Sequence, residues 1–180
     1  MILNNEYVKI KIDLDYTYSL NSSDNIIEYD IVHNLLEYVD KDNYYKVLSI
    51  SIDFINNKSI KIALIGDRNS YPVDCALLED NILSVLQNKI ITQIDINTGN
   101  IVKVIKLDNN WINNAIYKYK DNYIIYGEIE ITMLNHNFKE LWKFNCDDII
   151  ENIEINDEGI KLFCFEGNLY KLDFNGNKIN

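Results

Sequence analysis

Apolar and polar residues alternate at every second position over much of this chain. In residues 7–16 the alternation with charged side chains is strict, and the apolar positions are Val8, Ile10, Ile12, Leu14 and Tyr16. A period of two is typical of a β-strand with one buried and one solvated face. The pattern predicts a strand here and, by the same criterion, a succession of short strands along the rest of the chain.

The stretch from Asn81 to Leu107 predicts three short antiparallel strands joined by two tight turns. In its middle strand one face carries Ile90, Thr92, Ile94 and Ile96. The second turn contains Gly99, which adopts a positive φ at little cost. Asp95 opens this turn, so we expect its carboxylate to accept the free amide protons there.

The same arrangement of strand, turn and returning strand recurs at intervals of 42, 40 and 38 residues, opened by Asp53, Asp95, Asn135 and Asp173. Seven residues beyond the first three openers lie the apolar residues Ile60, Val102 and Trp142. We therefore expect each returning strand to dock an equivalent side chain. A period near 40 residues built from short strands is typical of propeller blades.

One copy of the repeat resembles a known family. Asp95-Ile96-Asn97-Thr98-Gly99 is similar to the D-x-x-T-G turn of quinoprotein-type propeller repeats, and Trp142 stands where such repeats often carry a tryptophan. The resemblance, which extends to WD-type blades, covers roughly residues 45–180, although the other copies lack the Thr-Gly pair. It implies blade-like sheets and no bound quinone, because a complete quinone-binding propeller is far longer than this chain.

These patterns predict an all-β fold, mainly β with at most one short helix, arranged as a partial or open β-propeller-like stack of antiparallel meanders. The 180 residues suffice for about four blades, whereas closed propellers usually have more. We expect a single domain over residues 1–180. Its first part, 1–43, would hold an N-terminal strand and the short helix, and residues 44–180 would form the meanders.

The short helix is predicted within residues 26–39. Apolar residues recur there at helical spacing, at Ile27, Ile31, Leu35 and Val39. Ser23 or Asp24 could cap its N-terminus. The pairs Ile26-Ile27 and Ile31-Val32 argue for the alternative, because β-branched residues are poor helix formers.

The net charge of −11 is concentrated in two segments, residues 1–42 and 147–158, each with a net charge of −6. The second segment contains no base, and its acids are Asp147, Asp148, Glu151, Glu154, Asp157 and Glu158. Such a distribution excludes nucleic acid as a ligand, since phosphate binding needs clustered Lys and Arg. It favours a basic protein partner that the charge would steer to the surface. The alternatives are a solvated face that keeps the chain soluble and, with less support from the spacing, a cation site.

No pattern for catalysis, metal binding or a cofactor occurs. His33 and His136 are far apart, and the chain has no C-x-x-C, P-loop, G-x-G-x-x-G or G-x-S-x-G sequence. Cys75, Cys146 and Cys164 are scattered and odd in number, so we expect free thiols. The absence of a basic, apolar start and of an apolar run of ~20 residues predicts a cytoplasmic protein with no membrane partner.

The sequence therefore predicts a non-enzymatic protein-binding module in which the six acids of residues 147–158 contact a basic partner. In profile, being small, acidic and free of catalytic motifs, the chain is similar to bacterial immunity proteins, which implies an inhibitor of a basic toxin. Two alternatives stay open. One is a small-molecule-binding or enzymatic propeller-like domain, which a deep pocket lined by tyrosines and carboxylates would support. The other is a structural repeat module of a larger assembly.

Overall fold

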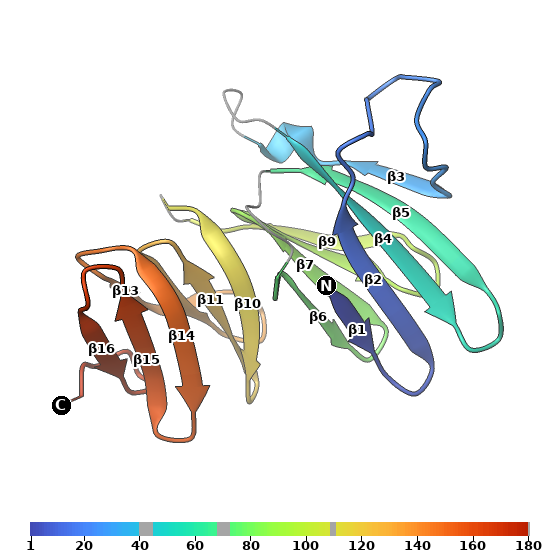
Figure 1. Ribbon diagram of the computed structural model, residues 1–180. Helices are drawn as coiled ribbons and strands as arrows, with labels where there is room; N and C mark the ends of the chain where they lie inside the picture. Colours follow the sequence, from blue (N-terminus) through green and yellow to red (C-terminus); the bar gives the residue numbers. More distant parts are fainter. Residues whose placement is uncertain (40–44, 68–72, 109–110, 180) are drawn as a thin grey trace. The chain divides into compact units, whose positions relative to one another are not determined.

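The structure, a computed structural model, describes residues 1–39, 45–67, 73–108 and 111–179, and is built almost entirely from β-strands (Figure 1). Within these residues there is one single-turn 3-10 helix, and no helix is long and apolar enough to cross a membrane. The all-β prediction is confirmed. The chain divides into two compact units, Met1–Asp108 and Asn109–Asn180, and each is described by itself. The single domain over 1–180 stays a prediction.

The N-terminal unit contains a five-stranded sheet, in the order β1-β2-β4-β5-β3, and a four-stranded meander, β6-β7-β8-β9. The strands are β1 (Ile2–Asn4), β2 (Val8–Leu14), β3 (Ile31–Asn34), β4 (Lys46–Phe54), β5 (Ser59–Gly66), β6 (Ala76–Glu79), β7 (Ile82–Gln87), β8 (Ile90–Asp95) and β9 (Ile101–Lys106). The central stretch thus forms three strands, as predicted. The N-terminal strands belong to the same sheet as β4 and β5, because β2 pairs antiparallel with β4.

One hydrophobic core joins the two sheets of this unit. Ile12 and Ile50 of the five-stranded sheet and Leu83 and Ile94 of the meander are fully buried in it. Burying an aliphatic side chain of this size contributes roughly 1.5–3 kcal/mol, so the apolar positions of the alternating pattern stabilise the unit.

The helix predicted within residues 26–39 is wrong. Ile31–Asn34 form strand β3, which pairs in parallel with β5, and only Leu36–Tyr38 adopt a 3-10 turn, η1. The backbone of this segment is held by β5, since Leu35 N donates to the carbonyl of Ile65 at 2.8 Å. The β-branched pair Ile31-Val32 lies in this strand, and long-range pairing with β5 overrode the helical spacing.

The C-terminal unit contains a four-stranded meander, β10-β11-β12-β13, and a three-stranded sheet, β14-β15-β16. The strands are β10 (Asn113–Tyr119), β11 (Asn122–Gly127), β12 (Glu130–Leu134), β13 (Glu140–Asn145), β14 (Ile150–Asn156), β15 (Gly159–Cys164) and β16 (Leu169–Leu172). Ile124 and Met133 of the meander share a buried core with Leu162 of the last sheet. At the edge of this core Trp142 Nε1 donates to the carbonyl of Phe174 at 3.0 Å.

Four hairpins use one turn geometry. In the hairpin opened by Asn135, its amide donates to Lys139 O and its carbonyl accepts from the amide of Phe138, which has a φ of 61°. The turns that begin at Phe54, Cys164 and Asp173 are closed by the same two backbone hydrogen bonds. The first turn therefore opens at Phe54 and not at Asp53. The turn at Asp95 is one residue longer, and its carboxylate accepts the amides of Asn97 and Thr98, as predicted.

The predicted equivalence of Ile60, Val102 and Trp142 is wrong. A β-bulge follows the last turn of each four-stranded meander. It places Val102 of β9 and Leu141 of β13 outside the ladder of paired residues, where their side chains are 60% and 52% exposed. Val102 therefore corresponds to Leu141, one position before Trp142. A shift of one residue moves a side chain to the other face of a sheet. Counting residues from the start of each turn therefore could not identify which residues of the returning strands are equivalent.

Candidate functional site

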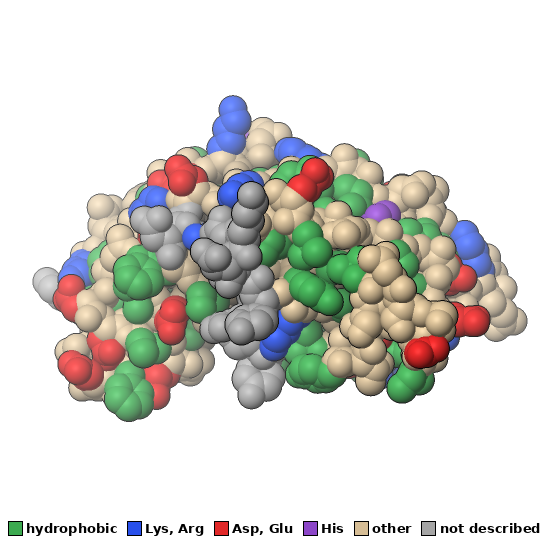
Figure 2. Space-filling view, turned by 90° about the horizontal axis from the view of Figure 1, so that it is seen from above, with side chains coloured by type: hydrophobic (Ala, Val, Ile, Leu, Met, Phe, Trp, Pro, Cys, Tyr) green, Lys and Arg blue, Asp and Glu red, His purple; other side chains and the backbone are tan. Residues whose placement is uncertain are grey.

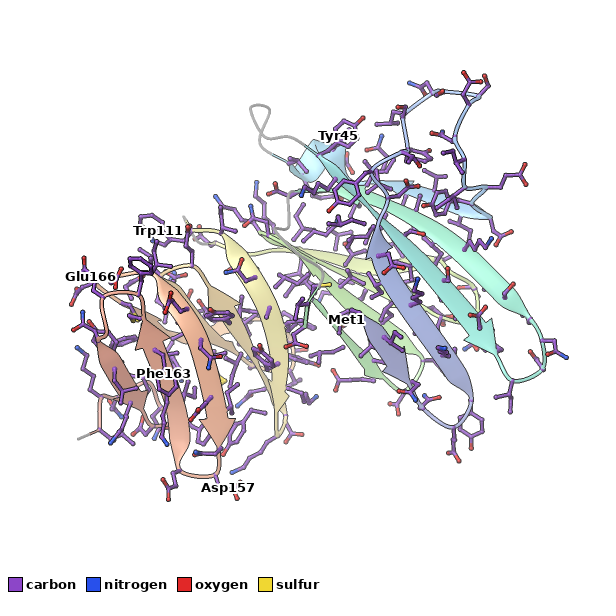
Figure 3. All side chains as sticks on the ribbon, viewed as in Figure 1. Met1, Tyr45, Trp111, Asp157, Phe163 and Glu166 are labelled. Atoms are coloured by element: carbon purple, nitrogen blue, oxygen red, sulfur yellow. The ribbon has the colours of Figure 1, made fainter. Side chains whose placement is uncertain are left out.

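Strand β14 separates five of the six acids of residues 147–158 into two groups. Asp147, Asp148 and Glu151 lie where the strand begins, and Asp157 and Glu158 form the turn beyond its end. The seven residues of β14 span roughly 20 Å, and Figure 3 shows Asp157 at the end of the unit opposite Glu166. The six acids therefore do not form one patch.

Glu154 belongs to neither group. It lies in the middle of β14 directly opposite Lys161 of β15, and the two charges are 3.9 Å apart. Lys161 in turn faces Lys171 of β16, so the middle of this sheet face has more positive than negative charge. Glu154 is consequently the weakest of the six candidates for contact with a basic partner.

The group at the start of β14 is fixed by Asp148. Its Oδ1 accepts the amide of Ile149 and its Oδ2 accepts the amide of Glu166, both at 2.6 Å. A third bond, from Phe165 N to Ile149 O at 2.9 Å, closes the same contact. The loop before β14 is thereby held against the loop after β15. Asp148 positions this end of the unit, and both of its carboxylate oxygens are already engaged.

Two large apolar side chains are exposed between these carboxylates. Phe165 is 69% exposed and Ile149 is 47% exposed. We call this region the loop-end surface, and it consists of Asp147, Asp148, Ile149, Glu151, Phe165 and Glu166. Figure 2 looks onto the end of the C-terminal unit that carries the loops and shows acidic and hydrophobic side chains intermixed there.

The electrostatics of the loop-end surface are predominantly negative. Asp147 Oδ2 accepts a hydrogen bond from the Tyr170 hydroxyl at 3.1 Å. Burial, followed by this hydrogen bond and the charge of Asp147, raises the pKa of Tyr170. Lys178 supplies a nearby positive charge, with its Nζ 4.7 Å from the centre of the Tyr170 ring. Four carboxylates, three on the two loops and one at the start of β14, outweigh it.

The sequence prediction missed Phe165, Ile149 and Glu166. Ile160, Leu162 and Cys164 of β15 alternate into the core, so strand periodicity directs Phe163 and Phe165 to the other side. That signal was present in the sequence. The link between the two loops was not, because it depends on the pairing of Ile150 with Cys164 across β14 and β15.

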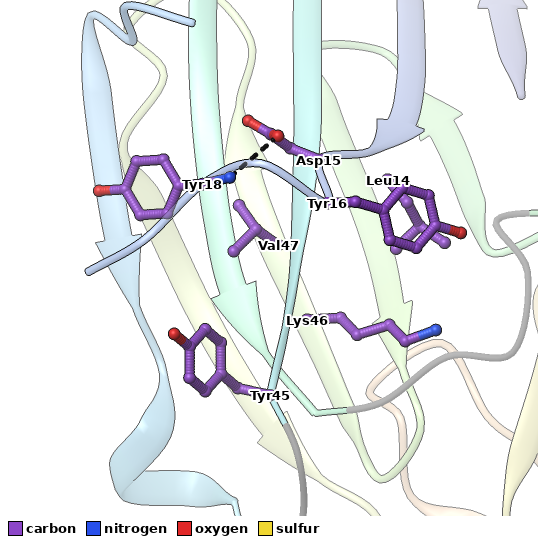
Figure 4. Close-up of a pocket in the computed structure, with 7 residues that line it drawn as sticks. All are labelled: Leu14, Asp15, Tyr16, Tyr18, Tyr45, Lys46 and Val47. Carbon is purple, nitrogen blue, oxygen red and sulfur yellow. Dashed lines mark hydrogen bonds between the residues drawn. The ribbon is translucent and has the colours of Figure 1, made fainter. Parts of the chain in front are cut away.

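A second candidate site is a pocket of about 340 Å³ in the N-terminal unit, at the ends of β2 and β4 (Figure 4). Its walls are Leu14, Asp15, Tyr16, Tyr18, Tyr45, Lys46 and Val47. Asp15 anchors the segment that carries two of the tyrosines. One of its carboxylate oxygens accepts the amides of Thr17 and Tyr18 at 2.8 and 3.1 Å. The other accepts the Tyr29 hydroxyl at 2.7 Å.

These bonds determine the charge of the carboxylate. Burial by itself would raise the pKa of Asp15, but the hydrogen bonds from Thr17, Tyr29 and Tyr18 together lower it. Burial and the neighbouring carboxylate raise the pKa of Tyr29 to about 12. Asp15 is therefore an ionised structural acceptor whose oxygens are occupied. The free charge of the pocket is the ammonium group of Lys46, 5.9 Å from the centre of the Tyr16 ring.

Another hollow, of about 550 Å³, lies in the N-terminal unit and is lined by Asn5, Glu6, Tyr7, Val8, Phe54, Asp80, Asn81, Ile96 and Asn97. Most of these residues belong to turns between strands. The hollow brings together one aromatic ring from a turn and two carboxylates. The first pocket concentrates three tyrosines and a cation, so it is the better candidate for a small ligand.

Comparison with known proteins gives the fold alone. No protein-family model matches the chain, and no curated protein is similar enough in sequence to match. Among solved structures, the chain is similar to dihydro-heme d1 dehydrogenase NirN in complex with DHE (TM-score 0.56, 11% identity over 76% of this chain and 33% of that one). It is also similar to Sqt1 of Saccharomyces cerevisiae (TM-score 0.54, 11% identity, 78% and 45% covered). A third match is BamB from Moraxella catarrhalis (TM-score 0.49, 13% identity, 79% and 48%).

NirN and Sqt1 are β-propeller or WD-type proteins, and the likeness confirms the propeller-like fold predicted from the repeat. The chain spans between a third and about half of the length of the structures it matches. At 11% identity the match carries no information about ligands or activity.

Proposed function

We propose that this chain is a non-enzymatic protein-binding module that engages a basic protein through the loop-end surface. The observation that carries the proposal is the exposed ring of Phe165 among four carboxylates, on loops that Asp148 holds together. A single surface thus offers an apolar anchor, a charged surround and a fixed backbone. These are the properties of a protein interface.

The energetics favour this use of the surface. Burying a Phe side chain contributes roughly 1.5–3 kcal/mol, which the free chain forgoes by leaving Phe165 in water. The surrounding carboxylates add long-range attraction for a positively charged protein and oppose an acidic one. Because the Asp148 bonds already fix both loops, little ordering entropy is lost on binding.

The finer form of the proposal is that the chain acts in the cytoplasm as an immunity protein and neutralises a basic toxin. A toxin that acts on nucleic acid needs a basic surface for phosphate binding. The loop-end surface could cover such a region, with Phe165 seated at its centre. Support for this form comes from the acidity of the chain, with a net charge of −11, and from the protein-binding character of the surface.

Photo-cross-linking tests the proposal. With a photo-reactive phenylalanine analogue in place of Phe165, we expect irradiation in the native cell to attach a basic protein to the chain. The matched control places the same analogue at Val102, which is 60% exposed on β9 of the N-terminal unit. We expect Val102 to give no adduct with that protein.

The two positions separate the possible outcomes. A basic protein attached from Phe165 and not from Val102 supports the proposal. Equal labelling from both positions, an acidic adduct, or adducts only between two copies of this chain would contradict it. The last result would instead favour a structural repeat module.

The tyrosine-lined pocket favours a second candidate function, the binding of a small aromatic anion. Tyr16, Tyr18 and Tyr45 provide faces on which a flat ring can stack, and Lys46 provides the charge for its acidic group. The Asp15 bonds hold the segment in place without a ligand. A pocket of this size lies at the lower end of the range for small-molecule sites.

Titration with 4-hydroxybenzoate tests this function. We expect the amide NMR signals of Tyr45 and Val47 to shift, with Lys46→Gln weakening the affinity at least about tenfold because a charge-assisted contact is lost. Neutral 4-hydroxybenzamide serves as the matched ligand and should bind the original chain correspondingly less well. Equal affinities for both ligands would show that Lys46 does not recognise an anion.

A further inference from the structure

Two of the three cysteines of the chain meet in the core of the C-terminal unit. Cys146 follows β13 and is 5% exposed, and Cys164 ends β15 and is 4% exposed. Both belong to the core that joins the two sheets of this unit. Each thiol affects the pKa of the other: the interaction raises the pKa of Cys146 and opposes the rise in the pKa of Cys164. Both thiols are free.

The backbone around the pair is fixed from both sides. The amide of Cys146 donates to Ile129 O at 2.8 Å, and Cys164 pairs with Ile150 in the ladder between β14 and β15. Asp148 then links the loop that follows Cys146 to the loop that follows Cys164. The backbone at both cysteines is therefore held in place by the fold.

We propose that Cys146 and Cys164 form a dithiol site that a low-molecular-weight disulfide oxidises to an intramolecular disulfide bond. The bond would tie together the two loops of the loop-end surface. This inference goes beyond the proposed function and does not depend on it, since it concerns a covalent change within the C-terminal unit.

The reaction balances in two exchanges. Cys164 loses its proton, and its thiolate attacks one sulfur of the reagent disulfide, forming a mixed disulfide and releasing one thiolate. Cys146 then loses its proton and attacks the sulfur of Cys164, which expels the second thiolate. The two protons convert the released thiolates to thiols, so the protein is oxidised by two electrons and the reagent disulfide is reduced by two. Cys164 reacts first because its interaction with Cys146 favours its thiolate.

The surroundings make this exchange slow at neutral pH. Burial, followed by Cys164 and Asp147, raises the pKa of Cys146 to about 12, with Lys178 opposing. Burial also raises the pKa of Cys164, as do Asp148 and Asp147. Two further titratable groups interact with the pair, the hydroxyls of Tyr126 and Tyr170. Because the thiolate is the reactive form, we expect the rate to rise with pH towards these raised values.

Cys75 provides a control within the chain. It is fully buried in the N-terminal unit, where its sulfur contacts that of Met1 at 4.0 Å. Burial raises the pKa of its thiol to about 11, so it shares the burial and the raised pKa of the pair but lacks a partner thiol.

The experiment uses oxidised glutathione on the full chain at mildly alkaline pH, followed by counting of thiols after denaturation. We expect the three free thiols to fall to one, with the mass of two hydrogens lost and no glutathione attached. Non-reducing peptide mapping should join the peptides of Cys146 and Cys164. The Cys75→Ala variant should lose both of its thiols, whereas Cys146→Ala and Cys164→Ala should form no internal disulfide.

The outcomes decide the question even if one variant folds poorly, because the peptide map of the unaltered chain is sufficient. Three thiols remaining, glutathione retained on Cys164 without closure, or a disulfide that includes Cys75 would each overturn the proposal. Circular dichroism on the oxidised chain shows whether the fold is kept. A further expected result is a higher thermal midpoint for the oxidised chain than for the reduced chain, which Cys146→Ala should abolish.

Discussion

Reversing two charges on the loop-end surface, Glu151→Lys together with Glu166→Lys, is expected to slow association with a basic partner about tenfold or more at low salt. Both side chains are exposed, so the exchange leaves the core intact. The physical reason is that carboxylates accelerate the encounter with a positive protein and lysines oppose it. The association rate constant would be measured by stopped-flow or surface-based kinetics, with the basic partner identified by photo-cross-linking from position Phe165.

The opposite end of β14 offers a control with the same change in net charge. Asp157 and Glu158 are likewise exposed and lie in the turn before β15, so Asp157→Lys with Glu158→Lys alters the total charge equally. We expect this variant to associate at nearly the original rate. At about 1 M salt, where charges are screened within ~3 Å, the difference between the two variants should largely disappear. Equal slowing by both variants would mean that only total charge matters and that the loop-end surface is not the interface.

The sequence predicted strands and turns well because both depend on neighbouring residues. Asp95 and Gly99 specify their turn through local hydrogen bonds and a positive φ, and the structure has both. The segment that became β3 was different. Ile27, Ile31 and Leu35 fit a helical spacing, yet the decisive interaction is parallel pairing with β5, some thirty residues further along the chain. A partner strand at that separation leaves no mark on local periodicity.

The candidate surface was predictable in charge but not in position. The density of acids in residues 147–158 is evident from the sequence. Their separation into two ends follows from β14 being a strand of seven residues, whose length the density of acids does not indicate. Glu166 joins the surface through the hydrogen bond from its backbone amide to Asp148, which is eighteen residues away in the chain. Contacts of this kind require the pairing register, which composition does not contain.

The largest expected effect on stability comes from Gly159→Ala at the start of β15. Gly159 has a φ of 146°, and a Cβ built there would lie 2.2 Å from the carbonyl oxygen of Leu172. Leu172 is fully buried, so its backbone cannot move without disturbing the core between the two sheets. We expect the free energy of unfolding of the C-terminal unit to fall by about 3 kcal/mol, through backbone strain together with the steric clash.

Gly167→Ala separates the two causes. Gly167 also has a positive φ, of 88°, but a Cβ at that position would meet nothing within 4 Å. This variant therefore reports backbone strain alone, which should cost about 1 kcal/mol. Both tryptophans of the chain, Trp111 and Trp142, lie in the C-terminal unit, so urea unfolding followed by tryptophan fluorescence measures that unit specifically. If the two alanine variants lost equal stability, contact with Leu172 would not limit this position, and the close approach of β16 to the start of β15 would have to be abandoned as the constraint that requires glycine there.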